Sequence, residues 1–392
     1  MLKAKYGKSL RDVTASAIEI IMESRGDDSG GYKSEHAQLR KAVFHKDIKL
    51  FIDIAENCHE KLHTDRKDQS LSYWSSYYLD ANIILACLYC EICRFEEAIE
   101  SLDRGLIVTS GQGRAGLIEN IFQAITPMLP TTECSNDFDT NRVAMDLIYP
   151  VGRFATLDAF DFSEQISDRP HPIVISSAIA HWPALQRWTP SYLMSKSLGG
   201  RRLVPIEVGE SYIHDDWAPQ FISIKKFLSD YIFSPTPRAK IGYLAQFNLL
   251  EHIRSLQTDI IVPDYCYVDI PGHESLAKIW TNAWLGPAGT VSPIHRDPYH
   301  NILAQVIGYK YVRTYSPNQE SKLYPPKPKD GLNMNNTSAV NVGTPDEENY
   351  PLFNSARYSE ALLSPGDVIY IPKGWWHYVK SLSVSWSVSF WF

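Results

Sequence analysis

The chain has 392 residues, of which 44% are hydrophobic and 21% charged, and its formal net charge is −7 at pH 7. This composition is that of an ordinary globular protein, so it excludes a disordered, collagen-like or coiled-coil chain, and the length suits two domains. The acidic excess gives no general attraction to nucleic acid phosphates, so we expect no direct contact with nucleic acid.

The first residues and the cysteine content indicate in which cellular compartment the protein resides. Residues 1–10 carry three lysines and no apolar core, so they do not look like a secretory signal. No stretch approaches the ~18 consecutive apolar residues of a membrane helix, and we expect no membrane association. Six cysteines are too few for a disulfide framework in a chain of this length. These features predict an intracellular protein, in the nucleus or the cytoplasm.

Up to about residue 130, apolar residues recur at helical spacing, which predicts an α-helical domain over residues 1–130. Two of its helices, at 81–89 and 95–106, resemble a tetratricopeptide-type hairpin, although no clear repeat at that period follows. Residues 131–144 are polar and rich in Thr, Asn and Asp, which indicates a linker.

From residue 145 onwards, the apolar pattern changes to short runs that are typical of β-strands and are separated by turns. The candidate strands are 172–176, 202–208, 240–246, 281–285, 301–307, 310–315, 367–371, 377–381 and 384–392. Many short strands in one domain favour a barrel or jelly roll. The whole chain is therefore predicted to have an α+β fold, with the helices first.

The first motif with chemical content is His295-Arg-Asp297. Alternate residues of a strand point to the same side, so His295 and Asp297 can both face the inside of a barrel. A second histidine, His377, follows Asp297 by 80 residues, just after the predicted strand 367–371. Two histidines and one carboxylate on one face form the facial triad of non-haem Fe(II) oxygenases. Alone, the pattern does not exclude histidines that only fill the core or the surface.

Two polar residues after this motif add to the case. Asn301 and Lys310 lie in the next two predicted strands, and Lys310 is flanked by two tyrosines in an otherwise hydrophobic strand. A 2-oxo acid that chelates a metal inside a barrel needs a cation for its far carboxylate, and a compact ammonium suits that task. The alternative is a lysine on the solvated surface.

Residues 282–297 (NAWLGPAGTVSPIHRD) and 363–378 (LSPGDVIYIPKGWWHY) resemble the two metal-binding segments of the JmjC-domain Fe(II)/2-oxoglutarate oxygenases. The resemblance implies a double-stranded β-helix, a jelly-roll of the cupin type, over residues 145–392. It also implies Fe(II), 2-oxoglutarate and O2 as cofactors and co-substrates. The implied iron ligands are His295, Asp297 and His377. The implied 2-oxoglutarate contacts are Tyr243, Ser292, Asn301 and Lys310.

The family resemblance further implies hydroxylation of a protein side chain. The acidic, aromatic segment 207–217 suggests that Glu207 and Glu210, together with Trp284, bind a basic side chain of a protein or peptide. We expect arginine rather than methyl-lysine, because a guanidinium pairs bidentately with carboxylates whereas methyl-lysine needs an aromatic cage. Histones and ribosomal or chromatin-associated proteins are candidate partners. The alternative is that this segment is a solvated acidic loop.

Other functions remain open at this stage. The first is demethylation of methyl-lysine in the histone H3 tail, the second is a catalytically weak JmjC adaptor, and the third is a cupin-like metalloenzyme without 2-oxoglutarate. Lys310 argues against the third, and the intact triad argues against the adaptor. The last predicted strand runs to Phe392 without the helical pair that some relatives use to dimerise, so we expect a monomer.

Overall fold

The computed structural model describes residues 9–25, 33–64, 68–111, 113–132, 134, 136–209, 218–234, 241–270, 272, 276–326 and 335–392. The chain divides into two compact units. The first contains residues 1–133 with the segments 197–204 and 223–225, and the second contains the remainder. Among the described residues, none of the helices is long and apolar enough to cross a membrane.

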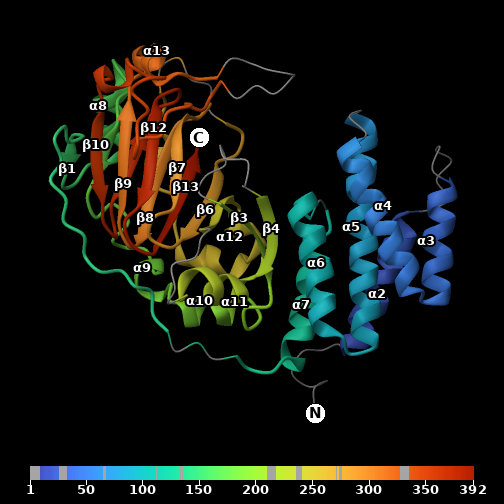
Figure 1. The fold of residues 1–392 in the computed structure, drawn as a ribbon. Helices are drawn as coiled ribbons and strands as arrows, with labels where there is room; N and C mark the ends of the chain where they lie inside the picture. The colour runs from blue at the N-terminus through green and yellow to red at the C-terminus, as the bar shows by residue number, and fades with distance from the viewer. Residues whose placement is uncertain are drawn as a thin grey trace. The chain divides into compact units, whose positions relative to one another are not determined.

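The first unit is built around α-helices (Figure 1). They are α2 (Leu10–Ser24), α3 (Lys33–His45), α4 (Ile48–Thr64), α5 (Asp68–Glu91), α6 (Phe95–Thr109) and α7 (Ala115–Ile125). Helix α2 begins with a capping box, because the side chains of Ser9 and Asp12 each accept a hydrogen bond from the other residue's backbone. Helices α5 and α6 are joined by residues 92–94 and pack against each other, which buries apolar side chains of both.

The second unit contains two β-sheets (Figure 1). The nine-stranded sheet has the order β1-β2-β11-β8-β13-β6-β5-β3-β4, and the four-stranded sheet has the order β10-β9-β12-β7. The strands of the larger sheet are β1 (Arg153–Phe154), β2 (Ile173–Ile175), β3 (Leu203–Val208), β4 (Ala218–Ser223), β5 (Gly242–Phe247), β6 (Trp280–Gly286), β8 (Asn301–Ile307), β11 (Val368–Ile371) and β13 (Ser385–Trp391). The smaller sheet contains β7 (Val291–Arg296), β9 (Lys310–Tyr315), β10 (Ser359–Leu363) and β12 (Trp376–Ser381).

The two sheets share a core. Leu303 and Ile369 of the larger sheet pack in one buried cluster with Val312 and Val379 of the smaller sheet. Short helices accompany the sheets: α8 (Ala159–Ser167), α9 (Ala184–Arg187), α10 (Pro190–Lys196), α11 (Ile224–Phe227), α12 (Leu249–His252) and α13 (Glu320–Leu323). The predicted α+β fold, a helical region followed by a jelly-roll of mostly antiparallel strands, is confirmed.

Besides the two-residue β1, three strands were absent from the sequence-based list. Strands β4 and β7 each contain a proline, at Pro219 and Pro293, and a proline normally argues against a strand. Strand β10 reads Ser-Glu-Ala-Leu-Leu and contains no β-branched or aromatic residue, so its intrinsic preference for a strand is weak. In all three, tertiary pairing outweighs the local sequence.

A glycine turn connects β8 and β9. Gly308 has a φ of +73°, and a Cβ atom at this position would lie 1.8 Å from the carbonyl oxygen of Val384. Both the backbone conformation and the lack of space therefore require glycine. Lys310 follows two residues later as the first residue of β9.

Candidate metal centre

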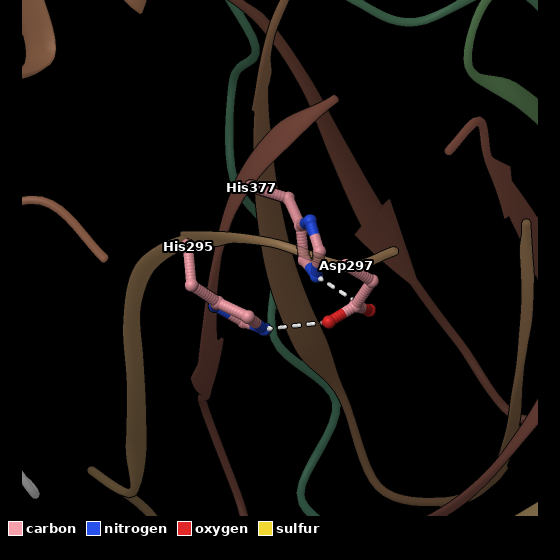
Figure 2. Close-up of side chains that lie close together, drawn as sticks. All are labelled: His295, Asp297 and His377. Carbon is pink, nitrogen blue, oxygen red and sulfur yellow. Dashed lines mark ion pairs between the residues drawn. The ribbon is translucent and has the colours of Figure 1, made fainter. Parts of the chain in front are cut away.

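Two histidines face each other across neighbouring strands of the smaller sheet. β7 and β12 are antiparallel, and their register places His295 directly opposite His377. The Nε2 atom of His295 lies 3.8 Å from Oδ1 of Asp297, and the Nε2 atom of His377 lies 3.6 Å from Oδ2 of Asp297. Figure 2 shows the three side chains converging on one point. Each offers a ligand atom within 4.8 Å of the others, and no other such group of three occurs in the described part of the chain.

Asp297 lies just outside the strand that was expected to carry it. β7 ends at Arg296, and Pro298 follows Asp297. Pro298 has no N–H to donate to a ladder, so the strand pairing does not continue past Asp297. The backbone carbonyl of Asp297 instead accepts a hydrogen bond from the N–H of Gly374, at 3.0 Å. The carboxylate is thus held on a tethered loop.

Backbone carbonyls orient both imidazole rings. Nδ1 of His295 lies 2.7 Å from the carbonyl oxygen of Pro293, and Nδ1 of His377 lies 3.2 Å from that of Trp375. A carbonyl can only accept, so Nδ1 carries the hydrogen in both rings and Nε2 keeps its lone pair. Burial, together with the neighbouring His295, lowers the pKa of His377 to about 4. Two imidazoles and one carboxylate form a donor set that fits Fe(II).

The triad lines a cavity between the sheets. Lys310 also lines this cavity, is only 2% exposed, and places its Nζ 3.1 Å from Oη of Tyr243. Among the described residues, no carboxylate oxygen lies within 4.0 Å of this Nζ, and burial lowers the pKa of Lys310 to about 7. The Oδ1 atom of Asn301 is buried without a hydrogen-bond partner. A buried cation without a carboxylate partner fits an anionic ligand such as 2-oxoglutarate, whereas the amide oxygen of Asn301 can only accept a hydrogen bond.

Comparison with known proteins agrees with this geometry. A model of the cupin-like domain matches residues 159–392. Lysine-specific demethylase JMJ30 of Arabidopsis thaliana is 33% identical over 85% of this chain and 83% of its own length. The chain belongs to the JmjC family of 2-oxoglutarate oxygenases. It is also similar to Jumonji C domain-containing protein 5 of Drosophila melanogaster, with 40% identity over 59% of this chain and 57% of that protein. Lysine-specific demethylase 8 of Xenopus tropicalis is 44% identical over 56% of this chain, but only 47% of its own length is matched.

The JmjC cavity contains most of the residues predicted for it. Tyr243, Ser292, Asn301 and Lys310 all line it together with the triad. Trp284 lines it as well, and its Nε1 donates a hydrogen bond to Oγ of Ser389 at 2.9 Å.

Of the two predicted acidic substrate contacts, only Glu207 lies among the described residues. Glu207 lies on β3 opposite Tyr243 in register, and among the described residues it does not belong to the cavity lining. Glu210 lies outside the described residues, as does the remainder of the acidic segment up to residue 217.

Sequence reasoning did not single out three aromatic residues next to cavity-lining positions: Trp280, Tyr299 and Trp391. Trp391 at the end of β13 pairs in register with Trp280 of β6 and with Asn301 of β8. Trp391 lies on the same face of β13 as the cavity-lining Ser389, two residues before it. Its ring centroid lies 5.7 Å from that of Tyr299, and Trp280 is 50% exposed. The alternation of β13, extended by one step beyond Ser389, could have revealed Trp391.

Proposed function

We propose that this chain is an Fe(II)- and 2-oxoglutarate-dependent protein oxygenase that hydroxylates an arginine C–H bond in a protein or peptide. The observation that carries the proposal is the position of Lys310. It is a buried cation without a carboxylate partner among the described residues, and it lines the same cavity as the His–Asp–His triad. A metal site of another type would not need this cation, whereas a bound 2-oxo dicarboxylate does.

Each side chain of the cavity then has a task. His295, Asp297 and His377 hold the metal, and Lys310 and Tyr243 bind the distal carboxylate of the co-substrate. The apolar wall of Leu303, Ile371 and Val379 excludes water from the reacting atoms. Bound Fe(II) and 2-oxoglutarate supply the oxidation: O2 and the 2-oxo acid yield succinate, CO2 and one oxygen atom for the substrate C–H bond.

The aromatic residues near the triad support a basic substrate. The Nζ atom of Lys278 lies 5.5 Å from the ring centroid of Trp280, so one face of this ring already accommodates a cation. The ring centroids of Tyr299 and Trp391 lie only 5.7 Å apart, so no cationic group fits between the rings, and they form one wall rather than opposite walls of a cage. A planar guanidinium stacks well on such a wall.

Methyl-lysine demethylation is the second candidate, and the names of two relatives favour it. The proteins from Arabidopsis and Xenopus are both named lysine-specific demethylases. Aromatic residues such as Trp280 and Trp391 are also the residue types that bind methylated ammonium groups. Histone tails contain both arginine and methyl-lysine, so they provide the first substrates to test.

Two assays test the proposal. The first measures succinate formation by the Fe(II)-loaded chain with 2-oxoglutarate and basic peptides, for the wild type and His295→Ala. We expect turnover only in the wild type, and its absence with every basic peptide would favour an adaptor. The second is mass spectrometry of an arginine peptide and a methyl-lysine peptide. A gain of one oxygen atom on arginine supports hydroxylation, whereas loss of a methyl group from lysine supports demethylation.

A further inference from the structure

A third histidine, His300, lies close to the metal ligands in sequence but does not belong to the triad. It follows Asp297 by three residues, directly precedes β8 and is only 4% exposed. Its backbone pairs with that of Phe392 through two hydrogen bonds of 3.2 and 3.1 Å. Its ring stacks on Tyr370 of β11, with centroids 5.8 Å apart and planes 7° apart. His300 is therefore held rigidly on both sides.

The ring of His300 contacts the loop that leads to the other metal ligand. The backbone N–H of Lys373 lies 3.3 Å from Nδ1 of His300, and the hydroxyl of Tyr370 lies 2.7 Å from the same atom. A backbone N–H can only donate, so Nδ1 is the acceptor and the Tyr370 hydroxyl donates to it as well. Nδ1 of His300 thus accepts two hydrogen bonds, and one of the two donors, the N–H of Lys373, belongs to the turn after β11.

This turn, residues 372–375, leads directly into β12 and His377. Gly374 donates its N–H to the carbonyl of Asp297, and the carbonyl of Trp375 accepts from Nδ1 of His377. Two neighbouring residues of the turn are therefore tied to the Asp297 segment, Gly374 through the backbone and Lys373 through the imidazole of His300. Together they join the segments of two metal ligands that are 80 residues apart in sequence.

We propose that His300 is a positioning residue of the metal centre. By accepting from Lys373 and Tyr370, its Nδ1 fixes the turn before β12 against the loop of Asp297, and so sets the separation of the Asp297 and His377 ligand atoms. This inference rests on the proposed function only in assuming that the triad binds a metal ion. His300 itself does not touch the metal, the co-substrate or the substrate.

The test measures Mn(II) binding to the full chain in the absence of 2-oxoglutarate and peptide. The concentration of free Mn(II) is determined by electron paramagnetic resonance. His300→Leu removes the acceptor, and we expect binding weaker by about 10- to 100-fold, the usual effect of losing an outer partner of a metal ligand. His300→Asn keeps an acceptor, because its Oδ1 is attached to Cγ as Nδ1 is in histidine. We expect it to restore most of the affinity, which a role in packing alone would not do.

A second pair of variants covers the case in which His300→Leu does not fold. Tyr370→Phe removes one donor to Nδ1 and keeps the stacked ring. Tyr265→Phe is its matched control, since it removes a tyrosine hydroxyl that donates to the carbonyl of Leu157 in the same unit. We expect weaker Mn(II) binding only for Tyr370→Phe.

Three results would overturn the inference: unchanged binding in a folded His300→Leu, an equal loss in His300→Asn, or equal binding by the two tyrosine variants. A wild-type chain that binds no Mn(II) would instead overturn the metal centre itself, so the two failures are distinguishable.

Discussion

Lys310 and Tyr243 connect the two sheets of the jelly-roll, because the Nζ atom of Lys310 on β9 donates to the hydroxyl of Tyr243 on β5 at 3.1 Å. Both side chains are buried, and Lys310 has no carboxylate partner among the described residues. The cavity thus keeps a buried amine without an anionic partner among the described residues, which an anionic ligand would supply.

The contribution of Lys310 to stability should rise with pH above neutrality. Burial lowers the pKa of Lys310 from 10.5 to about 7, so between these values the unfolded chain binds a proton that the folded chain does not. The contribution of Lys310 to the free energy of unfolding therefore increases as the pH rises from about 7 to 10. Urea unfolding of the ligand-free chain at pH 7 and pH 9 measures this change in the free energy of unfolding. Lys310→Met should remove this increase, whereas Lys380→Met, on the exposed part of β12, should keep it.

Metal binding should stabilise the fold. A ligand that binds only the folded state adds about 2.7 kcal/mol at one hundred times its dissociation constant. Mn(II) at that excess should raise the unfolding midpoint, and chelation by EDTA should reverse the gain. Asp297→Asn should lose the effect, because it replaces the carboxylate ligand, whereas His181→Ala, at an exposed histidine, should retain it. An equal stabilisation of both variants would place the metal elsewhere.

Trp391 should affect the peptide and not the co-substrate. Losing a cation–π contact of about 1 kcal/mol raises the KM for a basic peptide about fivefold. We expect this of Trp391→Leu, with the KM for 2-oxoglutarate unchanged, in steady-state assays of succinate. Phe160→Leu removes an aromatic ring that is exposed on α8 and is the control. Equal shifts of both KM values would show that Trp391 supports the cavity rather than the substrate.

Asp259 should be the most sensitive buried carboxylate of the second unit. It is fully buried at the end of a 3-10 helix (Arg254–Asp259), and accepts from Nη1 of Arg187, Nε1 of Trp188 and Oη of Tyr192. Asp259→Ala leaves the buried Nε1–H of Trp188 without its partner, at about 1–3 kcal/mol for such a group. Urea unfolding should show this loss, while Glu251→Gln, in the exposed pair with Lys278, should change little.

Sequence patterns were most successful where local and tertiary preferences agree. Strands β8 and β9 have the predicted bounds, 301–307 and 310–315, because hydrophobic runs are bounded there by Gly308 and other turn residues. The prolines of β4 and β7 concealed those two strands. A single sequence also carries no information on strand register, which places His295 opposite His377 and Trp391 beside Trp280. For the same reason, the contact of His300 with Lys373 could not be anticipated.

The turn at Gly308 has a consequence for how the site is encoded. The carbonyl of Val384 occupies the space that any side chain at 308 would need, so position 308 tolerates glycine alone. A bulkier residue there would displace the start of β9, and with it the side chain of Lys310, which we propose binds the co-substrate. The chemical identity of the cavity thus depends on a position that contributes no side-chain atom, and a search for functional residues by chemical type would pass over it.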